Sequence, residues 1–550
     1  MIEINANGSS HKYKQSVKIE TIVKELAIPN KHRIVAAIID NTVYDLDREI
    51  NKDCSIDFLR REDVLGNRIY RRSLFMLMAR AIYNLFPDSR LAIEYSLSNG
   101  IYCELKMAKA LNPTHLGKIK KEMTGMVKKN LPIKRMTVKA EEAIRLYKKQ
   151  KFYDKVKVVQ QSEREQFVVY ELDGYYDYFY YHMVPGTGYL DKFDLHYRYP
   201  GFVLLFPQKD SPDEVPGFIN QEKIAGVYTE AQRLGKIMGV ETVNEMNHSI
   251  VKGDYGRLIR IAEGLHEKNI ARIADKITEN IREKQIVLIA GPTSSGKTTF
   301  THRLSTQLMI NDLKPVAISI DNYFVNRENT PRDEDGNYDF ESIKAIDLDL
   351  LNNHLIRLLQ GREVEIPVYS FKNGQRIYNG TYLQIEENQP LLIEGIHGLN
   401  EKLTSVIPRG HKFKIYVSAL TQINIDSHNR IPTTDTRMIR RIIRDHKYRG
   451  HTASQTIDLW PSVRKGEEKY IFPYQENADI MFNSALIYEF AALKKFAVPL
   501  LAKIDSSKSS YYEAQRLLEI LSCFREIPLN QIPNTSILRE FIGNSVFRKD

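Results

Sequence analysis

An octapeptide in the second half of the sequence, GPTSSGKT from Gly291 to Thr298, has the residue types and the spacing that bind a phosphate chain. It follows the apolar run QIVLIA and opens the helix-like run TTFTHRLSTQLM, the strand–loop–helix context that such a loop requires. Glycines let backbone N–H groups converge on phosphate oxygens, and the helix start adds partial positive charge. In such a loop Lys297 reaches the β- and γ-phosphates and the Thr298 hydroxyl reaches Mg²⁺. The predicted nucleotide-binding residues are Gly291, Pro292, Thr293, Ser294, Ser295, Gly296, Lys297, Thr298 and Thr299.

Two carboxylates follow predicted strands at points where they could serve the same site. Asp321 comes directly after PVAISI, and Glu394 closes the strand in PLLIEGI. The carboxyl ends of parallel strands open into the ligand crevice of an α/β sheet. Asp321 could therefore take a proton from an acceptor hydroxyl, and Glu394 could hold Mg²⁺ directly or through water. An aspartate at such a point is as often a helix N-cap, and that alternative stays open for Asp321.

A run of arginines in DTRMIRRIIRDHKYRGH could balance charge on a transferred phosphoryl group. Several of them recur at i, i+3/i+4 and i+7, so they share one face of a helix. Guanidinium forks on that face would suit phosphate oxygens. An ordinary solvated basic face is the alternative. The arginines of this run are Arg437, Arg440, Arg441, Arg444 and Arg449.

The elements around these motifs predict a parallel sheet. Continuous apolar runs separated by helical patterns are typical of a parallel sheet that is covered on both faces. The guanine-reading pattern [NT]KxD of GTPases finds only AKID, which lacks the first residue, so a GTPase is disfavoured. The predicted strands are QIVLIA, PVAISI, PLLIEGI, KFKIYVSA and VPLLAKI.

The order of motifs over roughly residues 285–505 resembles the uridine kinase and phosphoribulokinase family. The motifs are the P-loop, D-x-[YF]-[YF], IPVYSF, strand-Glu-Gly and RRxxRDxxxRG. The resemblance implies Mg²⁺-dependent transfer of the ATP γ-phosphoryl group to a sugar hydroxyl, which is the 5′-hydroxyl in nucleoside kinases. It implies catalytic roles for Asp321 as base, Lys297 and Arg444, and Mg²⁺ roles for Thr298, Glu394 and Asp321. The substrate residues that it implies are Asp339, Phe324, Tyr369, Phe371, Arg441 and Arg449.

Three departures from the uridine–cytidine kinase pattern leave the acceptor open. The position three residues after the pocket phenylalanine, a base-reading histidine in those kinases, is Gly374. The aspartate between the two pocket aromatics is Ser370, and the lid sequence RGR ends in His451. Hydroxyl chemistry survives these changes, but the acceptor could be uridine, another nucleoside, or a different sugar or polyol.

The front half resembles the N-terminal part of threonyl-tRNA synthetase. Residues 1–62 resemble its β-grasp TGS module. YRRSLFMLMARAIYNLFPDSRLAIEYSLSNGIYCEL and MVPGTGYLDKFDL resemble its editing domain. The HxxxH pair of that domain corresponds to Arg72 and Met76, and its CxxxH pair to Phe179 and Met183. None of these side chains restores a metal or general-base site of that type. We therefore expect an editing-type scaffold without editing chemistry, and the whole arrangement resembles bacterial uridine kinase-like nucleoside kinases.

The predicted fold class is multidomain α/β and α+β. A P-loop parallel-sheet kinase domain follows a β-grasp TGS-like domain and an editing-like α+β domain. The expected ranges are a TGS-like domain (1–62), an editing-like domain (63–215), a helical connector (216–284), a kinase domain (285–505) and a C-terminal helix and tail (506–550).

Composition and charge narrow the setting without naming a partner. Three dispersed cysteines, no apolar N-terminal core and no run of transmembrane length favour a cytoplasmic protein with no membrane partner. The net charge of +10 permits anionic partners. Residues 118–157 carry fourteen Lys/Arg against four Asp/Glu, so contact with RNA is one hypothesis and a solvated basic face is the plainer one. A second functional hypothesis is an RNA-binding or nucleotide-sensing regulator that uses the P-loop domain as a switch. The front half could also serve dimerisation, which would make the protein a homo-oligomer.

Overall fold

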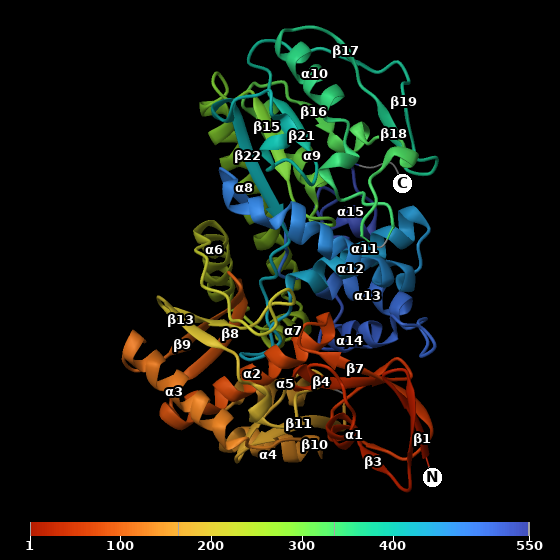
Figure 1. Cartoon of the computed structure of the whole chain (residues 1–550). Helices are drawn as coiled ribbons and strands as arrows, with labels where there is room; N and C mark the ends of the chain where they lie inside the picture. Colours follow the sequence, from red (N-terminus) through yellow and green to blue (C-terminus); the bar gives the residue numbers. More distant parts are fainter. Residues whose placement is uncertain (1, 163, 335, 548–550) are drawn as a thin grey trace.

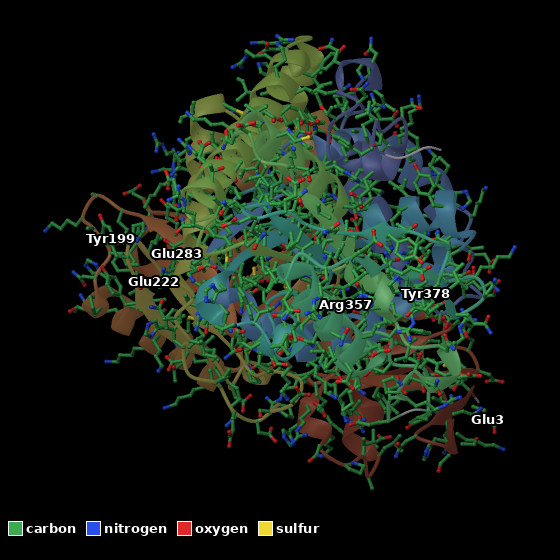
Figure 2. The ribbon with its side chains drawn as sticks, turned by 90° about the horizontal axis from the view of Figure 1, so that it is seen from above. Glu3, Tyr199, Glu222, Glu283, Arg357 and Tyr378 are labelled. Atoms are coloured by element: carbon green, nitrogen blue, oxygen red, sulfur yellow. The ribbon has the colours of Figure 1, made fainter. Side chains whose placement is uncertain are left out.

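A computed structural model describes residues 2–162, 164–334 and 336–547, and it shows two halves stacked on one another (Figure 1). The C-terminal half holds the parallel sheet, and helices of the last third of the chain lie between that sheet and the front half. Seen from above (Figure 2), Glu3 and Tyr199 lie on opposite sides of the view, so the front half extends to both sides of the C-terminal half. Within the described ranges, no helix is long and apolar enough to span a bilayer.

The first module of the front half is a five-stranded mixed sheet with one helix. The strand order is β2-β1-β7-β4-β5, and β1 pairs parallel with β7. The turn between β4 and β5 places Asp40 and Asn41 at φ of 50° and 57°, which these two residue types tolerate. The elements are β1 (Ile2–Ala6), β2 (Ser9–Tyr13), α1 (Ile19–Glu25), β4 (Ile34–Ile39), β5 (Thr42–Tyr44) and β7 (Cys54–Arg60). Two short strands, β3 (Val17–Lys18) and β6 (Glu49–Ile50), pair beside them.

The second module packs helices on two antiparallel sheets. Helix α2 (Val64–Leu85) runs through its core and is buried on all sides at its middle, where every residue from Ser73 to Ala79 is buried. One sheet has the order β13-β14-β9-β8 and the other the order β10-β11-β12. The strands are β8 (Arg90–Leu97), β9 (Gly100–Lys106), β10 (Ile133–Lys139), β11 (Gln166–Leu172), β12 (Tyr175–Asp177), β13 (Asp194–Arg198) and β14 (Gly201–Leu205). The remaining helices are α3 (Pro113–Lys129), α4 (Ala140–Lys149) and α5 (Tyr153–Gln161).

The C-terminal half is built on an all-parallel sheet with the order β16-β21-β15-β22-β23. Alternate side chains of the central strand β15 (Ile286–Ala290) enter different cores, Val287 and Ile289 on one face and Ile286 and Leu288 on the other. Such two-sided burial is why the strand reads as a continuous apolar run. The other strands are β16 (Val316–Ser319), β21 (Leu391–Glu394), β22 (Lys412–Ser418) and β23 (Ile480–Asn483).

Helices cover both faces of this sheet, which confirms the predicted fold class. Apolar side chains of α8 (Tyr255–Glu279) and α9 (Lys297–Ile310) pack on one face, and those of α10 (Leu348–Leu359) on the other. The range 216–284 is helical as predicted, with α6 (Glu222–Met238) and α7 (Val243–Val251) before α8. Its helix α8 is part of the C-terminal core. The proposed division into five ranges stays a prediction.

One predicted strand is wrong. VPLLAKI lies in the last turns of helix α13 (Glu489–Leu501) and just beyond it, and the edge strand is β23 instead. A short apolar run does not distinguish a strand from a buried helix. Here the helical spacing of the buried residues Ala497 and Leu501 matches the structure.

Besides α13, four more α-helices follow β22 among the described residues. They are α11 (Thr433–Arg449), α12 (Ala453–Tyr470), α14 (Tyr511–Ser522) and α15 (Arg539–Ile542). The predicted C-terminal helix is α14. The segment after it folds back toward α9 and α11 and contains α15 (Figure 1).

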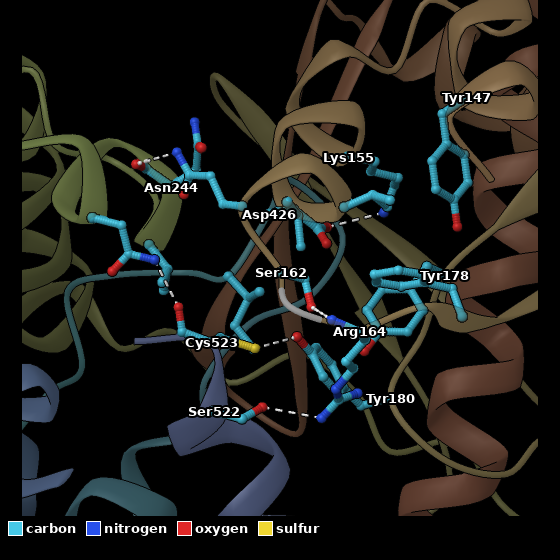
Figure 3. Close-up of a pocket in the computed structure, with 17 residues that line it drawn as sticks. Tyr147, Lys155, Ser162, Arg164, Tyr178, Tyr180, Asn244, Asp426, Ser522 and Cys523 are labelled. Carbon is cyan, nitrogen blue, oxygen red and sulfur yellow. Dashed lines mark hydrogen bonds and ion pairs between the residues drawn. The ribbon is translucent and has the colours of Figure 1, made fainter. Parts of the chain in front are cut away.

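The loop 419–432, which joins β22 to α11, is held by the front half through buried polar contacts. Lys155 Nζ lies 2.8 Å from Asp177 Oδ1 and 3.0 Å from Asp426 Oδ1. His428 Nδ1 lies 2.7 Å from Asp177 Oδ2. Figure 3 shows Lys155 reaching Asp426 across the pocket between the halves, where Cys523 and Tyr180 also meet. The front half therefore fixes the loop that leads into α11, the helix that carries the run of arginines.

Candidate active site

The P-loop adopts the strand–loop–helix arrangement that its sequence predicts. It joins β15 to α9, and Lys297 is the first residue of that helix. Gly296 has φ of 82°, a left-handed conformation that favours glycine. A Cβ on Gly291 would lie 2.0 Å from the carbonyl oxygen of Val417, so the close approach of β22 excludes any side chain there. Both glycines are thus required by the backbone.

Lys297 binds the backbone of the loop, and Thr298 links the start of α9 to Glu394 at the end of β21. Lys297 Nζ donates to the carbonyl oxygens of Gly291 and Pro292 at 3.0 and 3.2 Å. The Thr298 hydroxyl donates to the two oxygens of Glu394 at 3.1 and 3.2 Å. Burial raises the pKa of Glu394 to about 7, an effect that Lys297 opposes and that Asp321 adds to. The Glu394 carboxylate therefore lies where a cation would favour its charged form.

Asp321 lies in a short helical turn directly after β16. Its side chain remains exposed, but the surrounding protein desolvates the carboxylate and thereby raises its pKa. The charges of Lys297, Arg449 and Arg444 act in the opposite direction. A carboxylate with a raised pKa is a stronger base than an ordinary aspartate, which suits it to accept a proton.

The three predicted substrate and lid arginines converge on one residue that the sequence did not single out, Asp445. Arg441 Nε lies 3.2 Å from Asp445 Oδ2, Arg444 Nη2 lies 2.7 Å from Oδ1, and Arg449 Nε lies 3.6 Å from Oδ1. Burial opposes the charged form of Asp445, but the three guanidiniums outweigh it and lower its pKa. Asp445 thus holds the three guanidinium groups close together through shared ion pairs.

The other two arginines of the helix, Arg437 and Arg440, do not face the site. Arg437 is buried against Glu467 and donates to the carbonyl oxygen of Thr293 at 3.0 Å. Arg440 is buried against Glu489 at 2.7 Å and donates to the carbonyl oxygen of Ser294 at 3.4 Å. The prediction that the whole arginine face contacts a phosphoryl group is therefore wrong for these two. They bind the P-loop backbone instead.

The predicted aromatic residues form one cluster beside Asp321. The ring centroids of Phe324 and Tyr369 are 5.4 Å apart, those of Tyr369 and Phe371 5.1 Å, and those of Phe324 and Phe371 5.9 Å. Phe371 is 54% exposed, whereas the other two rings are buried. The buried Tyr369 hydroxyl has no hydrogen-bond partner among the described residues. Such a hydroxyl is available to form a hydrogen bond with a bound ligand.

The pocket is completed by residues on both sides of the aromatic cluster. Asp339 accepts a hydrogen bond from the Tyr470 hydroxyl at 3.2 Å. Burial raises the pKa of Glu341, two residues further on, and the charges of Arg441 and Lys297 oppose that rise. Gly374 has φ of 69°, and a Cβ there would lie 2.7 Å from Arg327 Nε. Where uridine–cytidine kinases have a histidine, this chain has a left-handed turn with an arginine packed over it.

The site lies at the carboxyl end of the sheet. It combines the phosphate loop, the carboxylates Asp321 and Glu394, helix α11 and the cluster of three aromatic rings. Residues 286–488 match the phosphoribulokinase / uridine kinase family. Over these residues the C-terminal half is similar to the P-loop kinases of that family, which supports a phosphotransferase. A solved structure described as a possible uridine kinase from Bacillus stearothermophilus is 18% identical, with a TM-score of 0.26, and the match covers 38% of this chain and 97% of that one.

The front half matches a different class of protein. A threonine–tRNA ligase of Clostridium kluyveri is 28% identical over 175 residues, which are 32% of this chain and 28% of the ligase. One of Clostridioides difficile is 28% identical over 168 residues, which are 30% of this chain and 26% of the ligase. The chain spans less than a third of the length of these relatives. The resemblance of the front half to threonyl-tRNA synthetase is confirmed.

Of the four positions that are predicted to correspond to the editing motifs, three lie in the core of the second module and Arg72 is half-buried. Met76, Phe179 and Met183 are buried there. Arg72 donates from Nη1 to the carbonyl oxygen of His182 at 2.9 Å. His182 in turn lies 2.8 Å from Asp45, which gives it a structural partner. These contacts are those of a packed scaffold.

Several residues that shape the kinase site were not identified from the sequence. Asp445 lies inside the quoted arginine run, and Glu341 lies two residues after the predicted substrate residue Asp339. Their charge near these motifs was therefore an available signal. Arg327 follows the D-x-[YF]-[YF] motif by three residues, but only the fold brings it to Gly374. Glu540 is far in sequence from every motif and reaches Thr299 only through folding. Among the described residues, no group of three or more His, Cys, Asp or Glu could hold a metal ion.

Proposed function

We propose that the kinase domain transfers the γ-phosphoryl group of ATP to a hydroxyl of a nucleoside, by resemblance the 5′-hydroxyl, with Asp321 as base. The observation that carries this proposal is the position of Asp321. It follows β16, within electrostatic reach of Lys297, Arg444 and Arg449, and an aromatic pocket begins three residues later at Phe324. A pure nucleotide switch has no use for an acceptor pocket.

The donor side is suited to Mg·ATP. Thr298 and Glu394 would hold Mg²⁺, because their oxygens are adjacent and the raised pKa of Glu394, about 7, marks a carboxylate that a cation would stabilise. A site of so few protein ligands is normal for Mg²⁺, which keeps waters and phosphate oxygens in its shell. The ion would supply positive charge to neutralise the charge that develops on the transferred phosphoryl group. Lys297 would bind the same phosphates from the loop.

The acceptor side orients a hydroxyl toward Asp321. Phe324, Tyr369 and Phe371 would pack on a planar base, and Asp339 would accept hydrogen bonds from sugar hydroxyls, as the resemblance implies. Arg441, Arg444 and Arg449, held together by Asp445, would close over the transferred group. Phosphoryl transfer needs little beyond such positioning and charge balance.

A kinase of a non-nucleoside sugar or polyol is the second candidate. It is favoured by Gly374 and Arg327, which replace the base-reading histidine with a guanidinium. An acceptor without a base would leave the aromatic cluster and the Tyr369 hydroxyl without a ligand contact. We therefore place nucleosides first.

The test is ADP release by the full chain with Mg·ATP and a panel of nucleosides, sugars and polyols. We expect turnover only with an acceptor, and Asp321→Asn to lower kcat by about 10²- to 10⁴-fold, the usual contribution of general-base catalysis. Asp349→Asn, an exposed aspartate of the same domain, is the matched control and should leave kcat unchanged.

ADP release that needs no acceptor, and that is equal in wild type and Asp321→Asn, would contradict the proposal. That outcome would favour the regulator in which ATP acts as a switch. Addition of RNA to the same assay tests the front half. Neutralising Lys118, Lys121 and Lys128, all exposed on α3, should weaken RNA binding if the basic segment contacts phosphates.

A further inference from the structure

The C-terminal segment, residues 529–547, packs against the phosphate loop and the start of α9. Glu540 Oε2 accepts a hydrogen bond from the Thr299 hydroxyl at 2.8 Å and lies 3.4 Å from the Thr299 backbone nitrogen, which also donates to it. Thr299 is the third residue of α9. A carboxylate of the chain itself therefore occupies the N–H and hydroxyl donors at the start of the P-loop helix.

Three further contacts fix the segment in this place. A Cβ on Gly296 would lie 2.5 Å from Ile537 Cγ2, so the Ile537 side chain is packed against the bare backbone of the loop. The Arg440 guanidinium lies 5.1 Å from the centre of the Phe541 ring. The rings of His302 and Phe547 are stacked with centroids 5.3 Å apart. Glu540 is thus presented by a segment that contacts the loop, the next turn of α9 and the arginine helix.

The donors that Glu540 occupies are those that an incoming nucleotide needs. In a P-loop the backbone N–H groups at the helix start hold the α- and β-phosphates. Glu540 also lies close enough to Glu394 to contribute, after burial and Asp321, to the raised pKa of that residue. A phosphate chain placed here would meet the charge of Glu540 as well as lose the Thr299 donors to it.

We propose that residues 529–547 form an autoinhibitory latch, in which Glu540 stands in for a nucleotide phosphate at Thr299 and must be displaced for nucleotide to bind. The inference rests on the proposed function only in taking a nucleoside triphosphate as the ligand of the loop. It needs no particular acceptor and no phosphoryl transfer.

Equilibrium binding of a fluorescent ATP analogue with Mg²⁺ to the full chain tests the latch. Glu540→Gln keeps the shape and an oxygen that can accept from Thr299, but it removes the charge. We expect its Kd to be about 3- to 10-fold lower than that of wild type, the effect of removing one like charge a few ångströms from phosphate in a hydrated site. Glu540→Asp keeps the charge and should bind no more than about 2-fold more tightly than wild type, well short of the gain in Glu540→Gln.

Glu526→Gln is the matched control, because Glu526 is an exposed glutamate that precedes the segment. Its Kd should equal that of wild type. Unchanged or weaker binding by Glu540→Gln would overturn the proposal, since Glu540 would then be neutral or a nucleotide-binding residue. Thermal unfolding of each variant guards against a folding defect.

Hydrogen exchange of the peptide covering residues 529–547 supplies a second readout. We expect Mg·ADP to increase exchange in wild type, because displacement of Glu540 frees the segment. Exchange that falls on nucleotide binding would overturn the latch. Failure of the kinase proposal would be seen separately, as nucleotide binding that responds to Glu540 without phosphoryl transfer to any acceptor.

Discussion

At the scale of single residues, the site is organised by carboxylates that gather cations. Asp445 collects Arg441, Arg444 and Arg449, and Glu394 lies between the Thr298 hydroxyl and the charge of Lys297. Each arginine side chain has many rotamers, so a shared counter-charge restricts the conformations it samples before substrate arrives. Asp445 is thus a positioning residue.

Asp445→Asn should therefore impair turnover more than nucleotide binding. The amide keeps the shape but leaves three guanidiniums without their shared charge, so they would repel one another and lose alignment. We expect kcat to fall about 10- to 100-fold, the scale of a misplaced catalytic group. Steady-state kinetics measure it, and Asp445→Glu, which restores the charge, should recover part of kcat. Asp458→Asn, an exposed aspartate of α12, should behave as wild type. Equal losses in both asparagine variants would contradict a positioning role.

At the scale of elements, helix α11 supports the P-loop by binding its backbone. Arg437 and Arg440 bind carbonyl oxygens of the loop, at Thr293 and Ser294, and are themselves neutralised by Glu467 of α12 and Glu489 of α13. Three helices thus meet at two buried ion pairs beneath the loop. A buried pair is costly to break on one side, because the remaining charge is left without a partner.

Glu467→Gln should for that reason destabilise the kinase domain. We expect a loss of about 3 to 5 kcal/mol in the free energy of unfolding, the typical effect of removing one partner of a buried pair. Glu468→Gln is a matched control one residue away, because both glutamates contact Arg464 but the side chain of Glu468 is 39% exposed and that of Glu467 is 0% exposed. It should change stability by less than about 0.5 kcal/mol. Denaturant unfolding of the two variants gives the comparison, and similar midpoints would refute the expectation.

At the scale of the whole molecule, the front half is joined to the arginine helix by charge networks. Arg68 of α2 lies 2.8 Å from Glu513 of α14, and Arg516 of the same helix binds both Glu513 and Asp435 at the start of α11. A second network joins Lys155 and Asp177 to loop 419–432. The two networks therefore hold the segment that leads into the site at loop 419–432 and at the start of α11.

Asp177→Asn tests the contact between the front half and loop 419–432. Burial alone would raise the pKa of Asp177, but Lys155 and His428 outweigh it and lower the pKa from 3.8 to about 2. The stabilisation from its charged form is therefore complete above about pH 4 and is lost as the pH falls toward 2. We expect the variant to be about 3 kcal/mol less stable at pH 7, with a difference from wild type that shrinks below pH 4. Urea unfolding at several pH values measures it. Asp173→Asn, an exposed aspartate paired with Arg80, should differ little from wild type. A pH-independent difference would rule out the charge as its cause.

The sequence by itself determined the P-loop, the strand-end carboxylates and the parallel sheet, because these depend on local patterns. A glycine frame, an apolar run and a helix start are each readable within about fifteen residues. The run VPLLAKI shows the limit of such patterns, since its role as helix or strand depended on what it packs against. Only the tertiary structure decided which arginines face the site, because Arg437 and Arg441 share a helix but meet different neighbours. It alone brought Arg327 to Gly374 and Glu540 to Thr299. Contacts between distant segments are set by the packing of the whole chain, which no local spacing records.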